Sequence, residues 1–176
     1  MKRALLVSLG GMIAATAAVV ASGCSSPNPD VRVNPGALDR AGFAEVAPVL
    51  NRRCGSVDCH GTPRRNLRIY GYGGMRAAPT DTPDFPATTP DEIERDFQSI
   101  MALEPEAMAK FIAEGRHDPR DLTFYMKPRN AQSHKGGERI VAGDNADLCI
   151  LTWLTATVHV SSCRAAAAET NPLQAP

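Results

Sequence analysis

From residue 43 onward, apolar residues recur at the three- and four-residue intervals of amphipathic helices. One face of the stretch FAEVAPVLNRRC carries four of them, Phe43, Val46, Val49 and Leu50. This pattern predicts a helix that ends near Cys54. Pro48 lies inside it and predicts a kink or a short first turn, because proline has no amide hydrogen to donate.

Later helices carry clear start signals. Thr89 suits an N-cap, Pro90 suits the first helical position, and Glu92 completes a capping box. A further helix is expected to begin at Pro105. Asp144 is the expected N-cap of a last helix that is rich in apolar residues.

Long loops connect these helices. Residues 61–90 hold many glycines and prolines, and a short extended segment is expected at Leu67–Tyr70. Leu122–Met126 is expected to form a helical turn that ends before Pro128. The sequence therefore predicts a mainly α fold, a small helical domain with long loops that spans residues 39–164.

The first residues have the pattern of an export signal. Lys2 and Arg3 precede an apolar stretch, and residues 1–23 end in small residues directly before Cys24. This pattern resembles the lipobox of bacterial lipoproteins, which implies cleavage before Cys24 and acylation of that residue as a membrane anchor. In lipoproteins of this type, Ser25 rather than an aspartate favours the outer membrane, facing the periplasm.

Composition narrows the classes of function. Residues 24–38 are expected to form a flexible tether, and residues 165–176 a disordered tail. The chain has 19 basic and 19 acidic residues, and removal of residues 1–23 takes away two basic ones, which leaves a net charge of −2. This balance argues against nucleic acid as a partner. We find no nucleophile–base pair, phosphate loop or carboxylate pair, so an electron carrier or binding module is expected rather than an enzyme.

Besides Cys24, the chain has four cysteines, Cys54, Cys59, Cys149 and Cys163. An even number in an exported protein permits disulfides, and four cysteines allow three pairings among which the sequence does not select. A disulfide between Cys149 and Cys163 is sterically reasonable, because Cys163 follows the expected end of the helix that carries Cys149.

The other two cysteines enclose a four-residue segment, and His60 follows Cys59 directly. Covalent attachment of haem uses two thiols, one for each vinyl group of the porphyrin, and an adjacent histidine that binds the iron from the same side. The familiar spacing has two residues between the cysteines, and Gly55 permits the turn that a longer bulge needs. The motif therefore predicts one covalent haem c at Cys54, Cys59 and His60.

Residues 40–157 resemble cytochrome c-like domains of the planctomycete type. The resemblance rests on a helix with F-x-x-V-x-P-x-L before the cysteines, a segment like L-R-L after CHG, the late loop MKPRNAQSHKGG (residues 126–137), and a W-L pair in the last helix. The matching residues are Phe43, Val46, Pro48, Leu50, Cys54, Cys59, His60, Gly61, Leu67, Arg68, Ile69, Met126, Lys127, Pro128, His134, Gly136, Gly137, Trp153 and Leu154. The resemblance implies a lipid-anchored electron-transfer protein with a redox partner protein in the cell envelope.

The resemblance also implies residue roles. Cys54 and Cys59 would form the thioethers, and His60 would be the proximal iron ligand. The sixth ligand would be Met126, which we prefer, or His134; a methionine ligand raises the reduction potential, whereas a second histidine gives a lower one. Aromatic residues expected around the haem are Phe124, Tyr125 and Trp153. Arginines expected to pair with its propionates are Arg52, Arg53, Arg64 and Arg65.

Two alternatives use the same residues. In the first, a Cys54–Cys59 disulfide replaces the haem, and the chain is an envelope lipoprotein of the same fold that acts as a binding or structural module. In the second, four side chains are zinc ligands, namely Cys54, Cys59, His60 and His134.

Overall fold

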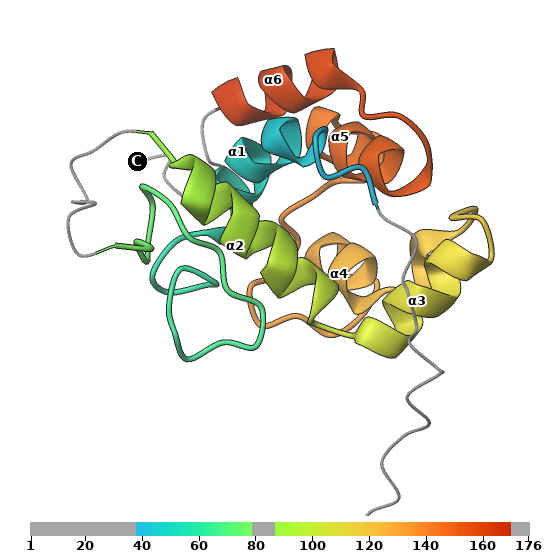
Figure 1. Cartoon of the computed structure of the whole chain (residues 1–176), viewed down its shortest axis with the longest axis horizontal. Helices are drawn as coiled ribbons and strands as arrows, with labels where there is room; N and C mark the ends of the chain where they lie inside the picture. Colours follow the sequence, from blue (N-terminus) through green and yellow to red (C-terminus); the bar gives the residue numbers. More distant parts are fainter. Residues whose placement is uncertain (1–37, 79–86, 170–176) are drawn as a thin grey trace, which may run out of the picture. The chain divides into compact units, whose positions relative to one another are not determined.

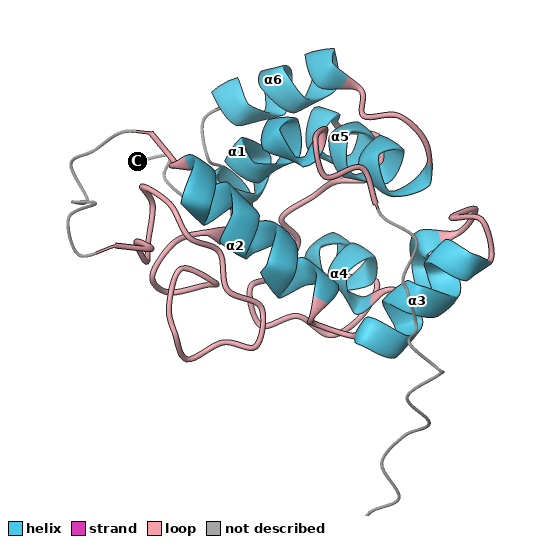
Figure 2. Cartoon of the chain, in the orientation of Figure 1, coloured by secondary structure: helices cyan, strands magenta, loops and turns pink. Residues whose placement is uncertain are grey.

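Six α-helices and two short 3₁₀ turns make up the regular structure of the computed structural model, which describes residues 38–78 and 87–169. The elements are α1 (Phe43–Cys54), α2 (Pro90–Met101), α3 (Pro105–Ala113), η1 (Pro119–Asp121), α4 (Thr123–Met126), η2 (Lys127–Arg129), α5 (Asn145–Thr155) and α6 (Val160–Ala168). Figures 1 and 2 show these helices and the long loops between them. The predicted mainly α class is confirmed, and no strand occurs in the part of the chain that is described.

The helix starts follow the sequence signals. Thr89 and Glu92 form a complete capping box at α2, and the Asp144 side chain accepts a hydrogen bond from the Asp147 amide at the start of α5. Pro48 lies within α1, whose twelve residues form one continuous helix. The segment expected to be extended at Leu67–Tyr70 pairs only through an isolated bridge from Tyr70 to Met75.

Trp153 is the centre of the hydrophobic core. It is fully buried, its indole nitrogen donates to the Asp39 carbonyl at 2.8 Å, and three other aromatic rings surround it. Their ring centres lie 5.1 Å (Phe43), 6.4 Å (Phe97) and 6.3 Å (Phe124) from the indole. Trp153 thereby joins α5 to α1, α2 and α4, and its predicted place in the wall of a haem pocket is wrong.

The C-terminal end is more ordered than the sequence indicated. Cys149 and Cys163 form a disulfide, which is the pairing that their spacing in the sequence made sterically reasonable. Cys163 and Ala166 of α6 are fully buried, and α6 lies along α5 and α1 (Figure 1). Residues 165–168, which the sequence placed in a disordered tail, are therefore helical, because the alanines after Cys163 favour a helix and one of them packs into the core.

Several sequence predictions lie outside the described residues. They are the export signal at residues 1–23, the acylated Cys24, the tether up to residue 37, and the tail from residue 170. Among the helices of the described ranges, none combines the length and the apolar character needed to cross a membrane.

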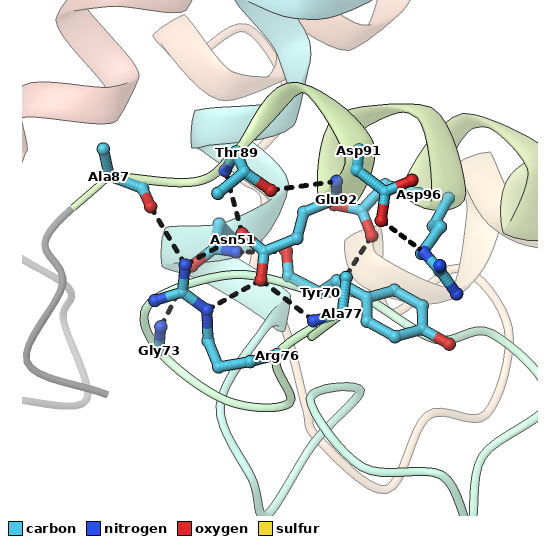
Figure 3. Close-up of polar contacts among 11 residues, drawn as sticks. Asn51, Tyr70, Gly73, Arg76, Ala77, Ala87, Thr89, Asp91, Glu92 and Asp96 are labelled. Carbon is cyan, nitrogen blue, oxygen red and sulfur yellow. Dashed lines mark hydrogen bonds and ion pairs between the residues drawn. The ribbon is translucent and has the colours of Figure 1, made fainter. Parts of the chain in front are cut away.

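The loop after α1 is tied to α2 by a buried ion pair. The Glu92 carboxylate is fully buried and accepts from Arg76 Nε at 2.7 Å, from the Thr89 amide at 2.9 Å and from the Ala77 amide at 3.1 Å (Figure 3). The Arg76 side chain is 7% exposed and also reaches the Ala87 carbonyl. Burial acts to raise the pKa of Glu92, but these hydrogen bonds hold that pKa below its ordinary value.

Removal of this carboxylate should destabilise the fold. We expect Glu92→Ala to lower the free energy of unfolding by about 3–5 kcal/mol, because it removes the buried carboxylate to which Arg76 and two backbone amides donate. The matched control on the same helix is Glu94→Ala, which breaks the exposed ion pair with Arg40 and should cost about 0.2–1 kcal/mol. Urea unfolding of both variants measures the difference, and equal losses would contradict the role assigned to Glu92.

Candidate functional site

A cavity of about 740 Å³ lies between the cysteine loop that follows α1, the segment at residues 64–69, and the late loop. Its volume falls in the range of about 300–1,000 Å³ that is usual for ligand sites. The apolar wall is formed by Leu50, Leu67, Ile69, Leu103, Phe124, Ile140 and Ile150. Cys54, Cys59, His60 and His134 line the same cavity. The structure therefore brings together four of the five candidate residues, from two separate parts of the chain, the segment 54–60 and the late loop.

The four-residue bulge folds back on itself. Cys54 is the last residue of α1, and the His60 amide donates to its carbonyl at 2.9 Å. Within the bulge, the amides of Cys59 and Gly61 both donate to the Ser56 carbonyl. These bonds close the longer spacing into a compact loop, so that the Cys54 and Cys59 side chains reach one cavity.

Three glycines hold this loop against the next one. A Cβ atom at Gly61 would lie 2.0 Å from the Gly55 carbonyl oxygen and 2.8 Å from the Gly74 Cα. A Cβ atom at Gly74 would lie 2.1 Å from the same oxygen. We call this contact of Gly55, Gly61 and Gly74 the glycine junction; it needs glycine because backbone meets backbone there.

The thiols of Cys54 and Cys59 are free in the structure, so the disulfide that the first alternative requires is not formed. Burial raises the pKa of Cys54 to about 12, with a further contribution from the neighbouring Cys59. Cys54 is therefore a neutral thiol at pH 7.

The two histidines of the cavity have matching environments. His60 Nδ1 lies 3.0 Å from the Leu67 carbonyl, and His134 Nδ1 lies 2.9 Å from the Gly137 carbonyl. A carbonyl oxygen only accepts, so each Nδ1 carries the hydrogen and each Nε2 has a lone pair for a metal. Such a hydrogen bond from the far nitrogen is how proteins usually orient a metal-binding histidine.

The imidazole rings of His60 and His134 lie nearly parallel. Their centres are 6.3 Å apart, and their planes differ by 15°. Imidazoles that bind one metal ion from opposite sides, with metal–nitrogen distances of about 2.0–2.1 Å, have ring centres about 6.3 Å apart. The separation and the angle therefore suit one metal ion held between the two rings.

Electrostatics keep His60 uncharged. Burial lowers its pKa below the ordinary value, and the nearby His134, Arg65 and Lys127 lower it further, while the hydrogen bond with Leu67 acts in the opposite direction. At pH 7 His60 is thus the neutral imidazole that a metal requires.

The late loop presents His134 at its tip. The amides of Arg139 and Ile140 both donate to the Pro128 carbonyl, which closes the loop at its base. Gly137 has a φ of +67°, and its amide donates to the His134 carbonyl. The two glycines after His134 in the sequence therefore serve the turn that carries this ring.

Arg139 supplies an unpartnered positive charge that the sequence did not point to. It lines the cavity, and its Nε and Nη1 atoms are buried without a hydrogen-bond partner among the described residues. Buried polar groups rarely lack a partner, so these atoms suit an anionic group of a ligand. The cavity is basic as a whole, with Asp58 as the one acidic residue in its lining beside Arg53, Arg64, Arg65, Lys127, Lys135 and Arg139.

Other candidates fall outside the cavity lining. Met126 is half-buried but is not among the lining residues, although Lys127 beside it is. Tyr125 packs under the Arg129 guanidinium, 3.5 Å from its ring centre, and of the three aromatic candidates only Phe124 faces the cavity. In residues 38–78 and 87–169, no three histidine, cysteine or acidic side chains gather as a metal site, so the four-ligand zinc site is not assembled.

Comparison with protein-family models, with curated proteins and with solved structures finds no match to this chain. The cavity is therefore interpreted from its own residues and geometry.

Substitution at the glycine junction should disturb the cysteine loop. We expect Gly61→Ala to lower the free energy of unfolding by about 1–3 kcal/mol, because its Cβ would overlap the Gly55 carbonyl. Gly73→Ala in the facing loop is the matched control, since its Cβ would come no closer than 3.3 Å to any atom. Urea unfolding should show a clearly smaller loss for Gly73→Ala, and the reverse order would contradict the junction.

Proposed function

We propose that this protein is a lipid-anchored c-type cytochrome of the bacterial envelope that holds one covalent haem and carries single electrons. The observation that supports it most directly is the pair of parallel imidazoles, His60 and His134, in a cavity that also receives the thiols of Cys54 and Cys59. A bound haem would supply a one-electron iron couple. The chain would supply the ligands, the apolar wall and the counter-charges.

The donor set fits haem c better than it fits a bare metal ion. His60 and His134 would be the two protein ligands of an iron whose remaining ligands a porphyrin supplies, whereas a structural zinc ion is usually bound by four protein ligands. The Cys54 and Cys59 side chains line the same cavity as His60, and attachment of the haem through thioethers would require this. The buried, unpartnered Nε and Nη1 atoms of Arg139 fit a propionate.

The sixth ligand in this proposal is His134. Its ring is held by Gly137 at the tip of a closed loop and lies 6.3 Å from the ring of His60, whereas Met126 is not in the lining of the cavity. His134 is therefore a better sixth ligand than Met126, which the sequence favoured. Two histidine ligands favour a lower reduction potential than a histidine–methionine pair and leave no open position for a substrate, which favours an electron carrier over an enzyme.

The remaining parts of the proposal come from the sequence. The lipobox before Cys24 supports an envelope location, with the outer membrane facing the periplasm as the destination. The electron would pass to and from a redox partner protein in that compartment. The alternative, a haem-free binding or structural module of the same fold, remains separable by a single mass measurement.

Haem attachment is tested by intact mass. We expect the chain, exported from a strain with the cytochrome c maturation proteins, to gain one haem and to give the pyridine haemochrome spectrum of a c-type haem. The double variant Cys54→Ser/Cys59→Ser should gain none, while Cys149→Ser/Cys163→Ser, which removes only the α5–α6 disulfide, should still carry it. A wild-type mass equal to the bare polypeptide would rule out the proposal.

The sixth ligand is tested by spectroscopy. His134→Ala should convert the low-spin iron to a species that binds carbon monoxide when reduced, because one coordination position opens. Met126→Leu, a change of similar volume just before the same loop, should leave the spectrum and the reduction potential unchanged. Loss of the low-spin spectrum in Met126→Leu, with His134→Ala unaffected, would reverse the assignment.

A further inference from the structure

The segment Leu67–Tyr70 lies between His60 and helix α2 and is bonded to both. Toward the histidine, the Leu67 carbonyl holds His60 Nδ1 at 3.0 Å, and the Ile69 amide donates to the His60 carbonyl at 2.9 Å. Toward the helix, the two alternate residues of the segment are bonded. The Arg68 amide donates to Ser99 Oγ at 2.8 Å. The Tyr70 amide donates to Asp96 Oδ1 at 2.6 Å. Alternate residues thus connect α2 with the imidazole.

Asp96 is an unusual member of this connection. It is fully buried, and its second carboxyl oxygen, Oδ2, is buried without a hydrogen-bond partner in the described part of the chain. A carboxylate in such a place is stabilised by only one amide, so a change in its charge has to be accommodated by the groups around it.

The charges near Asp96 do not neutralise it. Glu92, one turn earlier on α2, is the like charge that faces it, and Glu92 is already paired with Arg76 from the loop. Arg95 on α2 is bonded to Asp91 at 2.8 Å. From α1, the neutral Asn51 donates to the Tyr70 carbonyl at 2.7 Å. Among the described residues, Asp96 forms no ion pair with a cation.

Burial, and then the charge of Glu92, raise the pKa of Asp96 to about 8, while the Tyr70 amide acts to lower it. The unfolded chain would ionise this group near its ordinary pKa of 3.8, so the stability that the protonated carboxyl contributes is complete below pH 3.8 and is lost as the pH rises to about 8. The buried carboxyl therefore changes charge at a pH that living cells experience.

We propose that Asp96 is a positioning residue for His60, and that its charge state is coupled through Leu67–Tyr70 to the iron ligand and hence to the reduction potential. The coupling to the potential rests on the proposed haem; the link between Asp96 and His60 does not. When the site gives one electron to its redox partner, the added positive charge favours loss of a proton from Asp96 to solvent. By linkage, ionisation of Asp96 then favours the oxidised site.

The experiment compares the full chain with three variants. Asp96→Asn keeps an acceptor for the Tyr70 amide but cannot titrate, and Asp96→Leu is a second non-titrating variant of similar shape should the first fail to fold. Ser99→Ala is the matched control, since it removes the other bond between α2 and the segment without changing a titratable group.

In the haem-loaded protein, the reduction potential of the wild type should fall by about 30–60 mV between pH 7 and pH 9. At about 59 mV per tenfold for one electron, this fall corresponds to a three- to tenfold difference in the Asp96 ionisation constant between the oxidised and the reduced protein. Ser99→Ala should follow the wild type, and Asp96→Asn should be flat over this range. A flat wild-type curve, or an equal fall in Asp96→Asn, would overturn the coupling.

The haem-free Cys54→Ser/Cys59→Ser chain provides a second readout. There the ring signals of His60, one of four histidines, should show a step near pH 8 in proton NMR that Asp96→Asn abolishes. His60's own titration lies below its ordinary pKa and is separate from this step. No step would overturn the link. A step in this variant, together with a wild-type chain that takes up no haem, would keep the link and reject the proposed function.

Discussion

The described part of the long loop after α1 contains no helix or strand, so some of its backbone groups bond to one another and others bond to side chains of the helices beside it. Asn51 of α1 bonds the Tyr70 carbonyl and the Gly73 amide, and Glu92 and Asp96 of α2 bond the Ala77 and Tyr70 amides. The cavity is built on this loop. The segment that bonds His60 is therefore itself held by helix side chains that do not line the cavity.

The core and the cavity share several residues of one helical frame. Trp153 and the aromatic rings around it hold α1, α2, α4 and α5 together. Phe124 packs against Trp153 and also lines the cavity, and the core residues Leu50, Ile69, Ile140 and Ile150 line it as well. The cysteine loop and the late loop complete the lining, each closed by its own backbone bonds.

Sequence reasoning reached the elements whose signals are local. The capping box at Thr89, the N-cap at Asp144 and the helix before Cys54 are all present, since caps and apolar spacing act within one or two turns. It missed α6 because a run of alanines has no apolar stripe to read, and its burial depends on the disulfide and on α5. It also placed Trp153 beside the haem and preferred Met126 over His134. Contacts between distant parts of the chain decide which side chain of a loop reaches the cavity, and here the bonds of residues 139 and 140 to Pro128 close the loop that carries His134.

Two buried carboxylates on one helix differ in pKa because their hydrogen-bond partners differ. Glu92 and Asp96 lie four residues apart on α2 and are both fully buried. Glu92 accepts from a guanidinium and two amides, which hold its pKa below the ordinary value although the group is buried. Asp96 accepts from one amide, so burial dominates and its pKa rises to about 8. The first ties the loop to α2, and in our proposal this tie allows a change at the second to reach His60 through Leu67–Tyr70.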